Sequence, residues 1–223
     1  MSNAQRIIRI AKAEVGYHEG RSGGHWNNDE KYAAQVPGLS WANGQPWCAT
    51  FVSWCAMKAR LAKYYPRTAS TDTGARWFQD KGQWSQYPAV AAQGFLGHNG
   101  DMFHTFLVAR YDDTYVYTVE GNTNDNGSAE GDGVYEHKRL RRDPEIQGYG
   151  YPAFPEGLDS ADPSYRRRVA PKPKPAPTRG ANVDAAIAAA SKAEHANPAS
   201  KRPGKHHKLS RALAWLRKIG PHR

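Results

Sequence analysis

The spacing of apolar residues changes once along the chain, near Pro88, from a helical period to a strand period. Before Pro88, apolar positions recur at helical spacing in two segments that we predict to be helices: 3–15, capped by Asn3, and 48–62. We also predict a short helix at 29–36, stopped by Pro37-Gly38, and a polar helix near 72–81. After Pro88, aromatic and β-branched segments separated by turn sequences predict strands at 93–97, 102–111, 115–121, 134–140 and 147–153. Helices followed by an antiparallel meander are typical of an α+β domain.

The composition supports a packed core, since 39% of the 223 residues are hydrophobic and 11% are aromatic. The net charge of +10 is spread unevenly. Residues 1–165 carry 16 Lys and Arg against 19 Asp and Glu, whereas residues 166–223 carry 15 against 2. An affinity for polyanions would therefore belong to the last quarter of the chain.

These patterns predict three regions. Residues 1–155 form the α+β domain, with its N-terminal helices packed on an antiparallel sheet. Residues 156–181 form a linker rich in Pro, Lys and Arg, which we expect to be extended and semi-rigid. Residues 182–223 form a short basic appendage with two predicted helices, at 183–194 and 209–219.

The N-terminal segment mixes charged and apolar residues and has no apolar stretch of the kind found in export signals. No segment approaches the roughly 20 apolar residues of a membrane span. We therefore expect the chain to be made and to fold in the cytoplasm. Cys48 and Cys55 lie on one predicted helix with Cα atoms about 10 Å apart, too far for a disulfide, so we expect free thiols. Cys55 is expected to be a small buried hydrophobe.

Cys48 is the candidate nucleophile. It follows the loop Gln45-Pro46-Trp47 and opens a predicted helix, where the positive end of the helix dipole favours a thiolate and unpaired N–H groups can hold an oxyanion. Trp47 is a candidate wall of the site. Gln45 is a weaker candidate as an oxyanion donor, because a loop glutamine is more often only solvated.

A thiol nucleophile needs a base, and the base needs an orienting acceptor. His104 lies in a hydrophobic strand, where by itself a structural role would be the more common one. Glu120 ends the next strand, across the turn Asp112-Asp113. In a hairpin about this turn, the numbers of paired residues sum to about 225. Position 104 then lies opposite about 121, which makes His104 a cross-strand neighbour of Glu120 or Asn122.

Several motifs together resemble the CHAP domain, the cysteine- and histidine-dependent amidohydrolase/peptidase family. They are Trp47-Cys48-Ala49-x-Phe51-Val52-x-Trp54, the strand 104–108, Val119-Glu120-Gly121-Asn122, Gly16-Tyr17-x-Glu19 and Lys31-Tyr32. The resemblance covers about residues 3–154. It implies a papain-like fold with Cys48 as nucleophile, His104 as base, Glu120 as orienting carboxylate and Asn122 as an auxiliary polar group. It also implies a peptidoglycan substrate, cut at an amide of the stem peptide or cross-bridge.

The sequence departs from the family pattern in two places. The stretch 94–101 before the histidine strand is shorter than usual, which affects the edge of the groove. Calcium-binding members carry closely spaced aspartates before the cysteine, and 40–45 has none, so we expect neither a metal nor a cofactor. The histidines of the tail lack cysteine or acidic partners, and they are read as an extension of its basic surface: His195, His206, His207 and His222.

The resulting expectation is a monomeric peptidoglycan hydrolase resembling a bacteriophage endolysin, held in the host cytoplasm before release to the wall; a virion-borne lysin would look the same. Residues 166–223 would bind an anionic wall polymer or membrane surface, or serve only as a solubilising extension. Nucleic acid is an unlikely partner, because this region has no recognised binding motif and one aromatic residue, Trp215. Two alternatives stay open: an intracellular papain-like protease or transamidase, and a non-catalytic protein that binds wall or nucleic acid.

Overall fold

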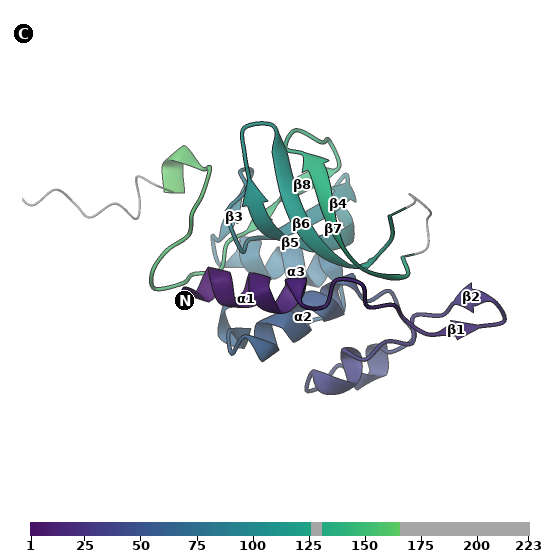
Figure 1. The fold of residues 1–223 in the computed structure, drawn as a ribbon. Coiled ribbons are helices and arrows are strands. Elements are labelled where there is room, and N and C mark those ends of the chain that lie inside the picture. Colours follow the sequence, from purple (N-terminus) through teal and green to yellow (C-terminus); the bar gives the residue numbers. More distant parts are fainter. Residues whose placement is uncertain (126–130, 166–223) are drawn as a thin grey trace, which may run out of the picture. The chain divides into compact units, whose positions relative to one another are not determined.

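The structure, a computed structural model, describes residues 1–125 and 131–165 and confirms the α+β class (Figure 1). The α-helices are α1 (Asn3–Lys12), α2 (Cys48–Lys58) and α3 (Thr71–Asp80). They precede a six-stranded sheet of order β3-β8-β4-β5-β6-β7 in which every neighbouring pair is antiparallel. Its strands are β3 (Trp84–Ser85), β4 (Gln93–His98), β5 (Asp101–Tyr111), β6 (Tyr115–Thr123), β7 (Gly133–Leu140) and β8 (Ile146–Gly150). None of the helices described has the length and apolar character needed to cross a bilayer.

The central helix α2 is buried on all sides at its N-terminal end. Its residues from Cys48 to Ala56 are all buried, including the polar Thr50 and Ser53. The sequence pattern predicts a single apolar stripe here, but α1, α3 and strands β5 and β6 surround the helix. A helix enclosed in this way becomes part of the core, and its first residue is held from several directions.

Helix ends differ from the predicted positions for local reasons. Ser2, and not Asn3, caps α1: its Oγ accepts the Gln5 N–H at 3.1 Å, while the Gln5 side chain accepts the Ser2 N–H at 3.0 Å. Helix α2 ends at Lys58, because the chain turns at Arg60, whose φ is 57°. The helix predicted at 29–36 is a single 3-10 turn, η1 (Ala33–Gln35).

Short elements were missed by the sequence pattern. A small hairpin joins β1 (Arg21–Ser22) to β2 (His25–Trp26) through Gly23 and Gly24, both with positive φ. The strand β3 has only two residues, as do β1 and β2. Periodicity cannot reveal a strand of two residues, although the Gly-Gly pair is a recognisable turn signal. Further 3-10 turns are η2 (Ser40–Ala42) and η3 (Ala62–Tyr64).

The hairpin of β5 and β6 forms about the predicted turn, one residue away from the predicted register. Leu107 pairs with Val119, and a bulge at Ala109 shifts the register again toward the turn. Toward the start of β5, the pairing with β6 stops at Leu107, while pairing with β4 continues to Asp101, with an irregularity at Phe103. This part of β5 carries His104.

The folded unit extends beyond the predicted boundary at residue 155. Ser160 forms a bridge with Ala89, and Asp162 accepts a hydrogen bond from Ser85 at 2.8 Å; both Ser160 and Asp162 are buried. These polar contacts attach the segment after Pro155 to the sheet. The part of the predicted linker from residue 156 to Tyr165 therefore belongs to the folded unit. The predictions for 166–223, including both helices, fall outside the described residues.

We predict that Gly94→Ala destabilises the domain, because a Cβ at this position would lie 2.1 Å from the ring of Phe106. Overpacking of this kind costs about 1–3 kcal/mol in the free energy of unfolding. Urea unfolding followed by circular dichroism measures it. In a Phe106→Leu background, which removes the ring, Gly94→Ala should cost less; an equal cost in both backgrounds would contradict the steric explanation.

Candidate active site

Cys48 is the first residue of α2 and is 4% exposed. The preceding Trp47 is the N-cap residue and supplies no side-chain hydrogen bond to the helix start. The first N–H groups of a helix have no partner within the helix, so those at the start of α2 remain available beside Cys48. Both Cys48 and Cys55 are free, and Cys55 lies fully buried in the core as expected.

His104 lies on β5, and its side chain is 13% exposed. The start of the strand is anchored by α3: the Asp72 carboxylate accepts the Met102 N–H at 2.8 Å, and the Thr71 hydroxyl donates to the Met102 carbonyl. The imidazole Nε2 lies 2.8 Å from Glu120 Oε2. The other ring nitrogen, Nδ1, is not engaged by Glu120, and Cys48 lies near enough to the imidazole to raise its pKa.

The protonation of His104 follows from these contacts. Burial of the ring by itself lowers its pKa, but hydrogen bonds to Cys48 and Glu120, together with their charges, outweigh burial and raise the pKa to about 10. His104 is therefore an imidazolium at neutral pH, with Nε2–H donating to Glu120. An imidazolium beside a thiol favours the thiolate, the form in which cysteine attacks a carbonyl.

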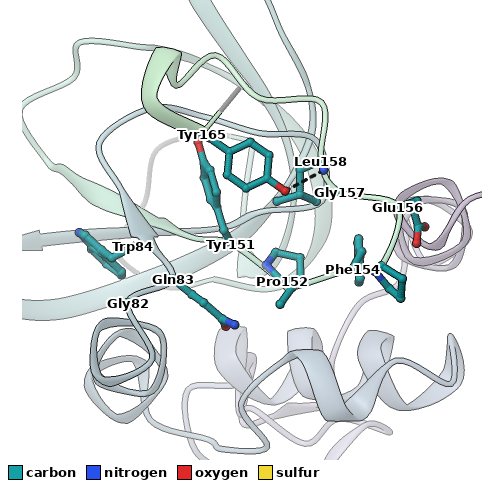
Figure 2. A pocket seen from close by; sticks show the side chains of 12 residues that line it. Gly82, Gln83, Trp84, Tyr151, Pro152, Phe154, Glu156, Gly157, Leu158 and Tyr165 are labelled. Atoms are coloured by element: carbon teal, nitrogen blue, oxygen red, sulfur yellow. Dashed lines mark hydrogen bonds between the residues drawn. The ribbon is translucent and has the colours of Figure 1, made fainter. Parts of the chain in front are cut away.

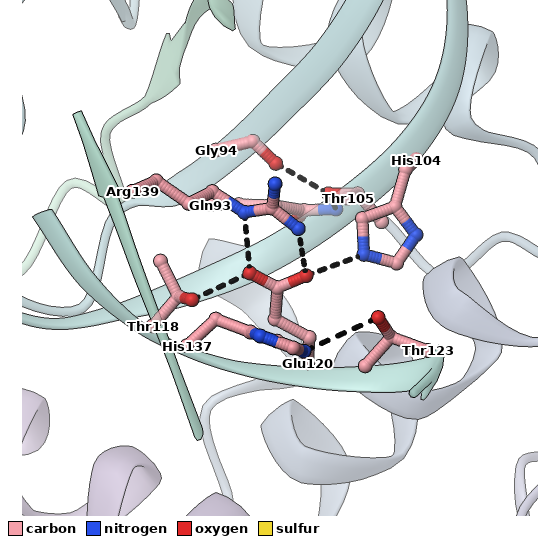
Figure 3. A network of polar contacts seen from close by, with 9 residues as sticks. All are labelled: Gln93, Gly94, His104, Thr105, Thr118, Glu120, Thr123, His137 and Arg139. Carbon is pink, nitrogen blue, oxygen red and sulfur yellow. Dashed lines mark hydrogen bonds and ion pairs between the residues drawn. The ribbon is translucent and has the colours of Figure 1, made fainter. Parts of the chain in front are cut away.

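Glu120 is the centre of a network of polar contacts (Figure 3). Its side chain is 0% exposed. Oε1 accepts hydrogen bonds from Thr118 Oγ1 at 2.5 Å and Arg139 Nε at 2.7 Å, and Oε2 accepts from Arg139 Nη2 at 2.7 Å besides its contact with His104. Burial by itself raises the pKa of Glu120, but Arg139 and His104 hold it well below the usual value. The carboxylate is thus ionised and fully hydrogen-bonded.

Asn122 forms hydrogen bonds that organise the loop preceding Cys48. Its backbone has a φ of 54°, and its Oδ1 accepts the Trp47 N–H at 3.1 Å. Its Nδ2 donates to Asn28 Oδ1 at 3.0 Å. Its side chain forms hydrogen bonds to Trp47, Asn28 and Gly131, so Asn122 fixes the loop that leads into Cys48.

The other two predicted site residues differ in position. Trp47 is 0% exposed, and its indole Nε1 donates to Glu19 at 2.5 Å, so its side chain belongs to the core and does not form the wall predicted for it. Gln45 is exposed, and its backbone N–H donates to the Ala42 carbonyl. Gln45 therefore remains a candidate substrate contact, and its exposure is the only observation that supports this role.

The remaining motif residues gather beneath the nucleophile loop. The rings of Tyr17 and Tyr32 contact each other and both contact Trp47, at centroid distances of 5.1, 6.1 and 5.4 Å. The Tyr17 hydroxyl also accepts the Lys31 N–H at 3.0 Å. Residues far apart in the sequence thus form one aromatic support for Trp47, which holds the chain just before Cys48.

Arg139 was not identified from the sequence. It lies on β7, where residues with inward and outward side chains alternate, and its own side chain is 21% exposed. The alternation of β7 places Arg139 on one face with Tyr135 and His137, but it does not indicate which residue on the facing strand Arg139 contacts. Only the packing of β7 on β6 reveals its bidentate contact with Glu120.

A pocket of about 560 Å³ lies elsewhere, lined by residues 82–84, 151–158 and Tyr165 (Figure 2). It adjoins β3, the edge strand opposite β7. Cys48, His104 and Glu120 do not line it, so it is separate from the chemistry described above. Among the described residues, no group of three or more His, Cys, Asp or Glu is arranged to hold a metal ion.

Comparisons with protein-family models, with curated proteins and with solved structures find no match to this chain. The chemistry of the site is therefore judged from its own residues: a thiol at a helix start, an imidazolium in contact with it, and a buried carboxylate that orients the imidazolium.

We predict that His104 stays protonated at pH 8, whereas His137, whose pKa is lowered by burial, is neutral there. Because the pKa of His104 is raised, the stability that its charge contributes is fully present below about pH 6.5 and is lost as the pH rises through about 10. Imidazole ¹⁵N chemical shifts measure both residues in one titration. A His104 that titrates at or below pH 6.5 would contradict the assignment.

Proposed function

We propose that the chain is a cysteine amidohydrolase with a papain-like fold. The observation that carries the proposal is the contact series from Cys48 to His104 to Glu120, in which a helix-start thiol meets a strand histidine whose far nitrogen lies 2.8 Å from a buried carboxylate. Nucleophile, base and orienting acceptor are the three roles that amide hydrolysis through a covalent intermediate needs.

In the first half of the reaction, the Cys48 thiolate attacks the carbonyl carbon of the scissile amide. A C–S bond forms, and the carbonyl electron pair moves to oxygen. The N–H groups at the start of α2 are suited to hold this oxyanion. The Trp47 N–H is not among them, because it donates to Asn122. The C–N bond then breaks, and the leaving amine takes a proton from His104.

In the second half, neutral His104 takes a proton from water, which attacks the thioester carbonyl. The C–S bond breaks, releasing a carboxylic acid and restoring the thiolate beside the imidazolium. Glu120 remains ionised throughout, since two hydrogen bonds from Arg139 and one from Thr118 hold its charge. Its part is to orient the ring and stabilise the imidazolium.

Peptidoglycan is the proposed substrate, supported by the motif resemblance to CHAP domains. An N-acetylmuramoyl-L-alanine amidase and a cross-bridge endopeptidase would use the same steps, and mass spectrometry of released muropeptides distinguishes them. The proposed setting is endolysin-like lysis of a bacterial host. A protease or transamidase would instead cleave or join protein substrates and release no muropeptides.

We predict that Cys48→Ala abolishes the clearing of purified cell walls, lowering the rate on the order of a thousandfold or more, because the nucleophile is lost. Loss of turbidity measures the rate. Cys55→Ala is the matched control, since it removes a thiol from the same helix outside the site. Wall clearing by Cys48→Ala at the parent rate would show that the chain is not a cysteine hydrolase acting through this residue.

We also propose that residues 166–223 concentrate the enzyme at anionic wall polymers or membrane surfaces, since they carry 15 basic against 2 acidic residues. Deleting them should weaken wall binding about tenfold at low ionic strength and little at high ionic strength, where charges are screened. Sedimentation with walls measures this. A chain of full length with these Lys and Arg residues changed to Gln should match the deletion, and unchanged binding in both would refute targeting by charge.

A further inference from the structure

The position of Arg139 requires its side chain to reach along the sheet. In the β6–β7 register, Arg139 pairs with Val116, while Glu120 pairs with Tyr135. The guanidinium nevertheless meets Glu120 at two points, Nε to Oε1 and Nη2 to Oε2, each at 2.7 Å. Two parallel hydrogen bonds between planar groups fix the plane of the carboxylate as well as its position.

This bidentate contact determines which oxygen faces the histidine. Oε1 is occupied by Arg139 Nε and Thr118, so Oε2 is the oxygen presented to His104 Nε2. We infer that Arg139 is a positioning residue of the reaction: it holds Glu120 charged and oriented, so that His104 is fixed with its other nitrogen toward Cys48. This inference extends the proposed cysteine hydrolase mechanism and rests on it.

The charged and titratable groups around Glu120 make Arg139 the permanent cation of the network. From β5 comes His104, in contact with Cys48 of α2, and from β7 come Arg139 and His137, with Tyr135 opposite in register. Burial lowers the pKa of His137, so it is neutral at pH 7. Arg139 keeps its charge at every pH in which the protein is folded. Two cations, Arg139 and His104, therefore balance one buried carboxylate.

Without Arg139, Glu120 would keep a single cation, and its carboxylate would be held only by the hydrogen bonds of Thr118 and His104. When a buried carboxylate loses a neighbouring cation, its pKa rises, so it becomes protonated at a higher pH than before. A protonated Glu120 no longer stabilises the imidazolium, and the thiolate of Cys48 then loses its partner. Loss of Arg139 should therefore change how the reactivity of Cys48 depends on pH.

The test is the pH dependence of Cys48 alkylation by iodoacetamide, with the modified residue identified by peptide mass spectrometry. This readout needs no substrate. The acid limb is the pH range in which the alkylation rate falls as the pH is lowered. In Arg139→Met, this acid limb should move to higher pH by about 1–3 units. In Arg139→Lys, which keeps the charge without the two-point contact, it should move less. Arg141→Met is the control. Arg141 donates a hydrogen bond to the Asp112 carbonyl at 2.8 Å, in the turn between β5 and β6, and not to Glu120.

A second arm separates positioning from a general structural role. If Arg139 acts through Glu120, then adding Arg139→Met to Glu120→Gln should cause no further shift of the limb. The inference is overturned if Arg139→Met and Arg139→Lys lower the melting temperature but leave the limb in place, or if the shift persists in the Glu120→Gln background. Failure of the parent chain to clear walls would refute the proposed function without changing either readout, so the two failures are distinguishable.

Discussion

A single ionised carboxylate, buried without any exposure, is the constraint on which the site depends. Removing the charge of Glu120 from water is costly unless its oxygens are paired, and the fold supplies partners from three adjacent strands. Thr118 comes from the same strand, Arg139 from β7 and His104 from β5. The need to satisfy one carboxylate thus links the registers of β5, β6 and β7 to one another and fixes the imidazole that contacts Cys48.

The same short stretch of β6 also holds the nucleophile loop. Glu120 orients His104, Asn122 accepts the Trp47 N–H, and Gly121 lies between them. A Cβ on Gly121 would lie 2.6 Å from the Trp47 ring and 2.7 Å from Phe51, so a residue without a side chain is needed for α2 to approach the strand this closely. Three consecutive residues therefore set the position of the His104 imidazole, the distance to the helix and the path of the chain before Cys48.

The sequence predicted the contact of His104 with Glu120, although the predicted register of β5 and β6 differs from the observed one by one residue. Both side chains are long enough to meet from diagonal positions, so a small error in pairing does not separate them. The same reasoning placed Trp47 on the surface of the site, because a residue beside a nucleophile suggests a substrate contact. The buried Glu19 carboxylate and the rings of Tyr17 and Tyr32 instead draw the indole into the core.

The sequence by itself determined the order of helices and strands, the helix start at Cys48 and the turn that brings β5 against β6, because periodicity and turn residues are local properties of the chain. Tertiary structure alone decided that Arg139 holds Glu120, that Asn122 serves the nucleophile loop and that the folded unit continues past Pro155. These outcomes depend on which side chains meet across elements far apart in the sequence, and on the cost of leaving a buried charge or polar group without a partner.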